Sequence, residues 1–137
     1  RDPTDSRYQE DGRAIPRRTL FVVSPGCRCT YRYSGVQVPP CEEPAFLAEI
    51  RERCTALAGL AEPPNACNVN LYRDGHDSVG WHTDDEELYE AKDNDAVILS
   101  LTLGARRRFQ LRAMEGEGKN SRPSVLALGH GDLCTME

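Results

Sequence analysis

The strongest constraint on the fold is a single change of hydrophobic period along the chain. Between Pro44 and Leu57 the apolar residues recur at helical spacing, with Arg and Glu on the opposite face. The apolar face, which we expect to pack on a sheet, consists of Phe46, Leu47, Ile50, Cys54 and Leu57. Pro44 suits the first helical turn, and Gly59 suits the end of the helix. The pattern therefore predicts one amphipathic helix over residues 44–57.

Most of the remaining chain consists of short apolar or alternating runs separated by turn signals, a pattern typical of strands. Strands are expected near residues 20–23, 29–35, 66–73, 79–82, 96–103, 107–112, 124–128 and 132–136. Paired prolines indicate a loop over residues 37–44. One helix followed by many short strands favours a mainly β sandwich or barrel with a flanking helix over alternating βαβ units.

The length of the chain, 137 residues, suits a single domain that buries a core without disulfide or metal staples. No apolar run approaches the roughly 18 residues that cross a bilayer. The N-terminal residues lack the apolar stretch of a secretory signal. Because the first residue is not Met and the last residues stop inside an apolar run, we expect a fragment that is cut at both ends.

The six cysteines are scattered over different expected elements and form no C-x-x-C pair. They are Cys27, Cys29, Cys41, Cys54, Cys67 and Cys134. The first two are separated by one residue, which is too close for the usual zinc-finger spacing. An even number would suit disulfides in a secreted protein, but reduced intracellular thiols are the favoured interpretation.

The net charge of −5 argues against indiscriminate nucleic-acid binding, although the charge is unevenly distributed. Basic residues outnumber acids in residues 1–32 and 105–122, whereas residues 84–95 are strongly acidic. The two basic segments are able to form one basic face. Phosphate contacts are then expected from Arg17, Arg18 and Arg106–Arg108. The alternative is a solvated surface of mixed charge.

A histidine and an aspartate two residues apart, His82 and Asp84, form the candidate metal pair. In a strand, residues i and i+2 point to the same face, so both side chains would reach one cation. Nitrogen and oxygen ligands suit Fe(II), and two His with one carboxylate leave open positions for a cosubstrate and O₂. The alternatives are two polar residues in a solvated acidic loop, or a zinc hydrolase, which would need further His or Cys ligands nearby.

Four stretches of the sequence carry a family resemblance, in the expected order. They are "PRRTLFVV" with "YRYSG", "NVNLYRDGHDSVGWHTDDE" at residues 68–86, "ILSLTLGARRRFQLR" at residues 98–112, and "LALGHGDLCTME" at the end. Together they resemble the AlkB family of Fe(II)- and 2-oxoglutarate-dependent nucleic-acid demethylases, over roughly residues 14–137. This ordered set is far more specific than the His-x-Asp pair alone.

The resemblance implies a double-stranded β-helix, which is a jelly-roll or cupin-like fold, incomplete at the C-terminus. It implies a single dioxygenase domain over residues 1–137. Within that domain we expect a loose segment at residues 1–13, a nucleotide-recognition region at 14–43 and a partial β-helix core at 66–137.

The resemblance also assigns roles to particular residues. His82 and Asp84 match two iron ligands, and the third, a histidine, is expected beyond Glu137 together with the arginines that clamp 2-oxoglutarate. Asn70 and Tyr72 match residues that bind 2-oxoglutarate. The expected substrate-binding residues are Tyr31, Arg32, Tyr33 and Asp85. A flipped base needs a flat stacking partner, which a Tyr ring or a guanidinium plane offers. His130 matches a turn residue, so its expected role is structural. His76 is expected to lie exposed in a turn.

The implied activity of the full-length protein is oxidative demethylation of N-alkylated bases such as 1-methyladenine and 3-methylcytosine. It would use Fe(II), 2-oxoglutarate and O₂ and would release formaldehyde, succinate and CO₂. The expected partner is alkylated DNA, with RNA as an alternative and no membrane. A monomer located in the nucleus is expected. The fragment by itself is expected to be inactive and to bind iron weakly. Two further alternatives are a same-fold oxygenase acting on RNA or protein, and a non-catalytic nucleic-acid-binding fragment.

Overall fold

The computed structural model describes residues 16–33, 36–84, 88, 96–113 and 122–136, which form two compact units divided between Ala96 and Val97. The segment expected to be loose, residues 1–13, and the acidic residues 89–95 lie outside this range. The described residues contain nine strands and one helix, so the prediction of a mainly β fold with a flanking helix is confirmed. No helix in the described part of the chain is both long and apolar enough to span a bilayer.

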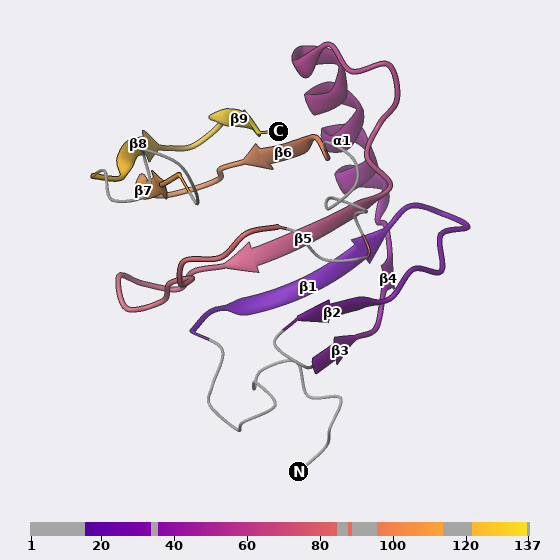
Figure 1. The fold of residues 1–137 in the computed structure, drawn as a ribbon. Coiled ribbons are helices and arrows are strands. Elements are labelled where there is room, and N and C mark those ends of the chain that lie inside the picture. Colours follow the sequence, from indigo (N-terminus) through magenta and orange to yellow (C-terminus); the bar gives the residue numbers. More distant parts are fainter. Residues whose placement is uncertain (1–15, 34–35, 85–87, 89–95, 114–121, 137) are drawn as a thin grey trace. The chain divides into compact units, whose positions relative to one another are not determined.

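The first unit is built on a three-stranded sheet in the order β4-β1-β5 (Figure 1). The central strand β1 (Arg18–Val23) pairs in parallel with β4 (Cys41–Glu42) and antiparallel with β5 (Ala66–Leu71). The β1–β5 ladder runs from Arg18 opposite Leu71 to Val23 opposite Ala66. Strands β2 (Tyr31–Tyr33) and β3 (Val36–Val38) form a separate antiparallel hairpin. The segment expected to be a loop, residues 37–44, thus contains part of β3 and the whole of β4. Its paired prolines had indicated no strand there.

The core of this unit lies between β1 and the β2–β3 hairpin. Its buried members are Phe21, Val23, Tyr31 and Val38, and Phe21 is only 1% exposed. The rings of Phe21 and Tyr31 stack with their centroids 5.3 Å apart. Such an aromatic pair contributes about 0.5–1.5 kcal/mol beyond its buried area. This contact fixes the hairpin against the central strand.

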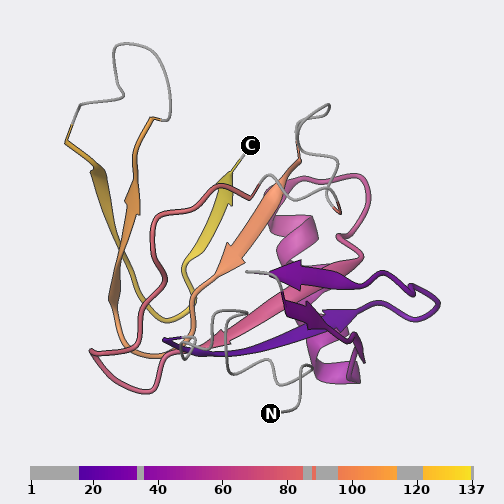
Figure 2. The same cartoon turned by 60° about the horizontal axis from the view of Figure 1, so that its bottom comes forward.

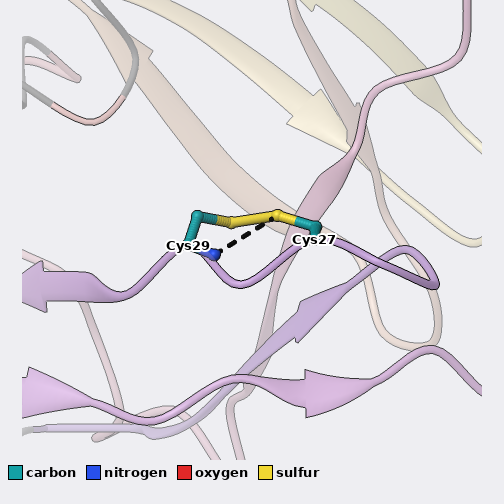
Figure 3. Close-up of a disulfide and its surroundings, with 2 residues drawn as sticks. All are labelled: Cys27 and Cys29. Carbon is teal, nitrogen blue, oxygen red and sulfur yellow. Dashed lines mark hydrogen bonds between the residues drawn. A yellow bond between two sulfur atoms is a disulfide. The ribbon is translucent and has the colours of Figure 1, made fainter.

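A disulfide joins Cys27 and Cys29 in the loop that leads from β1 to β2 (Figure 3). The Cα atoms of the two residues are 5.7 Å apart, within the range that a disulfide spans. The expectation of reduced thiols is therefore wrong for this pair. The other four cysteines are free, as expected. Both bridged residues pack against the core cluster.

The described helix, α1, spans Ala45–Ala58, so that it begins and ends one residue later than expected. Pro44 is the extended N-cap residue rather than part of the first turn. Gly59 ends the helix with φ 69°, and its amide donates to the carbonyl of Ala56. This left-handed cap is the conformation that glycine adopts without steric cost.

The expected apolar face of α1 is only partly buried. Cys54 is buried, whereas Phe46 and Leu57 are 67% and 80% exposed. The helix therefore contacts the rest of its unit through a narrower stripe than the period-based face suggested. An ion pair joins the helix to the segment that precedes it. The guanidinium of Arg51, in the middle of α1, lies 2.9 Å from the carboxylate of Glu43, just after β4. This contact raises the pKa of Arg51.

The second unit contains two strand pairs, one nested inside the other along the chain (Figure 2). The outer pair is β6 (Ile98–Leu101) with β9 (Leu133–Met136), and the inner pair is β7 (Arg107–Leu111) with β8 (Ser124–Leu128). All four strands fall where the sequence predicted them. The pairing among the described residues does not by itself constitute a jelly roll.

The turn between the two strand pairs explains the role of His130. The imidazole Nδ1 of His130 accepts a hydrogen bond from the backbone amide of Gly104 at 3.1 Å. Gly131 has φ 86° and donates to the carbonyl of Thr102, and Asp132 caps the amide of Gly129 with its carboxylate at 2.7 Å. The expected structural role of His130 is confirmed.

Candidate metal and cosubstrate site

His82 and Asp84 lie close together, although the local structure differs from the expectation. Residues 77–84 form an extended loop after β5, so the strand expected at 79–82 is wrong. Glycine at position 80, exposed side chains and the absence of a pairing partner among the described strands account for this difference. The Nε2 atom of His82 nevertheless lies 3.6 Å from Oδ1 of Asp84. Their convergence therefore comes from a loop and not from the two-residue period of a strand.

The second ring nitrogen of His82 fixes which atom is available to a metal. Nδ1 lies 2.7 Å from the carbonyl oxygen of Gly80, and this contact requires that Nδ1 carries the hydrogen and donates it. In the neutral imidazole the lone pair is then on Nε2, which lies toward Asp84. Metal-binding histidines commonly donate their other N–H to a backbone carbonyl in this way.

The spacing and chemistry of this pair fit one divalent cation. Two ligands about 2.1 Å from the same metal and at right angles lie about 3 Å apart, close to the observed separation. Both side chains are partly exposed, at 43% and 39%. Within the described ranges, no group of three His, Cys, Asp or Glu residues gathers around one point. The pair thus has the atoms and spacing of two metal ligands, and its role, like that of a third ligand, stays a prediction.

The loop that carries His82 and Asp84 is anchored by Asp77, which sequence reasoning did not identify. The Asp77 side chain is 6% exposed and accepts three hydrogen bonds from Arg73, one from its amide and two from its guanidinium, at 2.7–2.9 Å. The hydrogen bonds and charge of Asp77 raise the pKa of Arg73. The only signal in the sequence was an Arg and an Asp four residues apart in "RDGHD".

A second anchor joins the same loop to the start of β1. The amide of Ser78 donates to the carbonyl of Pro16 at 2.7 Å. Within the loop, the carboxylate of Asp74 accepts from the amide of His76, which is exposed in a turn as expected. The loop that carries His82 and Asp84 is therefore held at its base by Arg73, just after β5, and by Pro16, just before β1.

The two residues expected to bind 2-oxoglutarate lie at the end of β5. Asn70 is opposite Thr19 of β1, and Tyr72 follows the last residue of the strand. The side-chain oxygen of Asn70 accepts a hydrogen bond from Nε of Arg17 at 2.8 Å. Arg17 is only 8% exposed, so the solvated-surface alternative is wrong for this arginine, whereas Arg18 is exposed. The function of Asn70 and Tyr72 stays a prediction.

The expected substrate-binding residues have different surroundings. Arg32 is exposed on β2, opposite Gln37. Tyr31 is 9% exposed and its ring packs on Phe21. Tyr33 belongs to β2 by its backbone, and Asp85 lies outside the described residues.

The arginines expected to contact phosphate do not all belong to one unit. Arg107 begins β7, and both Arg106 and Arg108 are exposed there. Arg17 and Arg18 belong to the first unit, and Arg106–Arg108 belong to the second. The expected basic face stays a prediction.

Comparison with known proteins relates the chain to one family. Residues 6–137 match the model of the 2OG-Fe(II) oxygenase superfamily. The chain is 34% identical over 128 residues to the DNA oxidative demethylase ALKBH2 of Mus musculus, and 32% identical over 128 residues to that of Homo sapiens. It is 37% identical over 78 residues to the alpha-ketoglutarate-dependent dioxygenase alkB homolog 3 of Mus musculus.

The extent of these matches differs between the chain and its relatives. The two ALKBH2 alignments each cover 90% of this chain, and the alignment with homolog 3 covers 53%. They cover 50%, 46% and 26% of the respective relatives. The chain thus spans about half the length of the ALKBH2 proteins that it matches.

Proposed function

Because this chain belongs to the 2OG-Fe(II) oxygenase superfamily, as a member of its AlkB family, we propose that the full-length protein is an oxidative demethylase of N-alkylated bases in DNA. The family implies Fe(II) and 2-oxoglutarate as cofactor and cosubstrate. The observation that carries the proposal is the His82–Asp84 pair, with its Nδ1–H held by Gly80 and Nε2 turned toward the carboxylate.

The proposed chemistry is divided between the bound groups and the protein. Bound Fe(II) with 2-oxoglutarate and O₂ supplies the oxidising power that hydroxylates an N-methyl group, with succinate and CO₂ as coproducts, and the hydroxymethyl base then releases formaldehyde. The protein binds and orients the reactants. His82 and Asp84 hold the metal, and Asn70 and Tyr72 hydrogen-bond the cosubstrate.

Substrate recognition is proposed for the segment around β2. The target base must be extruded from a duplex, or already be unpaired, before it reaches the metal. Arg32 is exposed and has a flat guanidinium on which a base stacks. Tyr31, Tyr33 and Asp85 are proposed to complete the base pocket. For Tyr31 the test compares the KM for a methylated oligonucleotide between two variants. Tyr31→Phe keeps the aromatic ring, whereas Tyr31→Ala removes it.

Further proposals concern the whole protein. We propose that the strands belong to a double-stranded β-helix and that the metal site takes its third protein ligand from outside residues 1–137. Alkylated bases such as 1-methyladenine and 3-methylcytosine are the proposed lesions. The proposed location is the nucleus and the proposed state a monomer.

The test is turnover by the full-length protein, with Fe(II) and 2-oxoglutarate, on an oligonucleotide that contains 1-methyladenine. Turnover is measured as the release of formaldehyde and the recovery of adenine. His82→Ala should abolish turnover. His76→Ala is the matched control, because His76 is an exposed histidine of the same loop, and it should retain activity. Methylated RNA and protein extracts serve as competing substrates. Turnover that survives His82→Ala, or that occurs only on RNA or protein, would contradict the proposal.

A further inference from the structure

The feature that carries a further inference is the contact between Arg17 and Asn70. Arg17 precedes β1 by one residue, and Asn70 lies on β5, the antiparallel neighbour of β1. Nε of Arg17 donates to Oδ1 of Asn70 at 2.8 Å. The arginine is 8% exposed, whereas the next residue, Arg18, is exposed. A buried guanidinium is therefore held against the side-chain amide of a residue in the proposed cosubstrate site.

This contact determines how the amide of Asn70 is oriented. The amide has one acceptor, Oδ1, and one donor group, Nδ2–H₂, which are nearly equal in shape. A guanidinium has donors only, so it accepts just one of the two orientations, with Oδ1 toward Arg17. The opposite orientation would set N–H groups against N–H groups and lose the hydrogen bond.

The consequence is that the Nδ2–H₂ donors of Asn70 are directed away from the guanidinium. The carboxylates of 2-oxoglutarate offer only acceptors, so they require donors from the protein. We propose that Arg17 is a positioning residue, which holds the Asn70 amide with its donors available to an anionic oxygen of the cosubstrate. This inference rests on the proposed function of the site.

The competing role for Arg17 is a direct contact with nucleic-acid phosphate. Such contacts come from side chains that reach the surface. The low exposure of Arg17 disfavours that role, and its adjacent neighbour Arg18 is better placed for it. The two roles predict different kinetic effects, because one concerns the cosubstrate and the other the oligonucleotide.

The experiment measures kcat and the KM values for 2-oxoglutarate and for a methylated oligonucleotide in the full-length protein. Loss of one hydrogen bond to a charged ligand corresponds to about a ten- to hundredfold weaker affinity. Arg17→Ala should raise the KM for 2-oxoglutarate by that factor and leave the KM for the oligonucleotide unchanged. Arg17→Lys should restore part of the affinity, because an ammonium group also only donates. Arg18→Ala should leave the KM for 2-oxoglutarate unchanged.

A double-mutant cycle shows whether Arg17 acts through its partner. If it does, Arg17→Ala combined with Asn70→Ala should bind 2-oxoglutarate no more weakly than Asn70→Ala alone. A merely structural arginine would instead lower the melting temperature and give additive effects. Additive effects, an unchanged KM for 2-oxoglutarate in Arg17→Ala, or a rise confined to the KM for the oligonucleotide would each overturn the positioning role.

Failure of the proposed function gives a different result. A wild-type protein that does not bind 2-oxoglutarate in a calorimetric titration with Fe(II) under anaerobic conditions would overturn the proposed function, and with it the cosubstrate role of Arg17. Binding by the wild-type protein together with an unaffected Arg17→Ala variant would overturn the positioning role alone.

Discussion

Replacement of Phe21 by alanine should destabilise the first unit strongly, whereas the same change at Leu20 should not. Phe21 is 1% exposed and stacks on Tyr31, while its neighbour Leu20 on the other face of β1 is 46% exposed. Truncation of a buried phenylalanine typically costs about 3–5 kcal/mol, a range that includes the lost stack. Full burial of a leucine contributes about 1.5–3 kcal/mol, so half-burial at Leu20 corresponds to about 1 kcal/mol.

The difference in unfolding free energy between the two variants is large relative to the stability of a unit of this size. A domain of about 100 residues unfolds at a cost of about 5–15 kcal/mol, so Phe21→Ala removes a substantial part of it. Urea unfolding of the 137-residue chain is followed by the fluorescence of Trp81, its sole tryptophan, which belongs to the same unit. Equal losses of unfolding free energy in Phe21→Ala and Leu20→Ala would refute the assignment of this core, including the packing of Tyr31.

Three further predictions concern other parts of the chain. Asp77→Asn, which keeps the side-chain shape but removes the buried charge, should raise the Kd for Fe(II) of the full-length protein by about tenfold in a titration. Burial raises the pKa of Cys67, so at pH 8 less of it is thiolate and iodoacetamide should modify it more slowly than exposed Cys41, with the rates converging in urea. Gly131→Ala should cost about 1–2 kcal/mol because φ is 86° there, whereas Gly75→Ala, a turn glycine without positive φ, should cost less in the same unfolding assay.

Elements with a strong local pattern were predictable from the sequence. Strand β8 has the expected bounds, and β6, β7 and β9 lie within the expected ranges. The bounds of helix α1 were predicted to within one residue, because Gly59 provides a clear stop. These elements depend on periodicity and turn residues, which are local properties.

Features that depend on distant contacts were not predictable in the same way. The exposure of Phe46 and Leu57 reflects how little of α1 meets the sheet, which its own period does not encode. The hydrogen bond of the buried Arg17 goes to Asn70, which lies on β5, 53 residues further along the chain. The His-x-Asp spacing, and then the resemblance, singled out His82 and Asp84 as a pair. The strand expected at residues 79–82 is a loop, whose geometry is fixed by hydrogen bonds rather than by a repeating pattern.

The nested strand pairs of the second unit have a consequence for the order of folding. The innermost pair, Leu111 with Ser124, closes the shortest loop, and within each ladder the next pair outward encloses only two more residues. The step from β7–β8 to β6–β9 is larger, and the outermost pair is Ile98 with Met136. Once the inner pair has formed, each further pair closes only a short additional loop, so the entropic cost of chain closure is divided into small steps. By contrast, the ladder between β1 and β5 encloses the hairpin, β4 and the whole of α1. Because nonlocal pairing slows folding, we expect hydrogen exchange to show protection of the second unit's strands before that of β1.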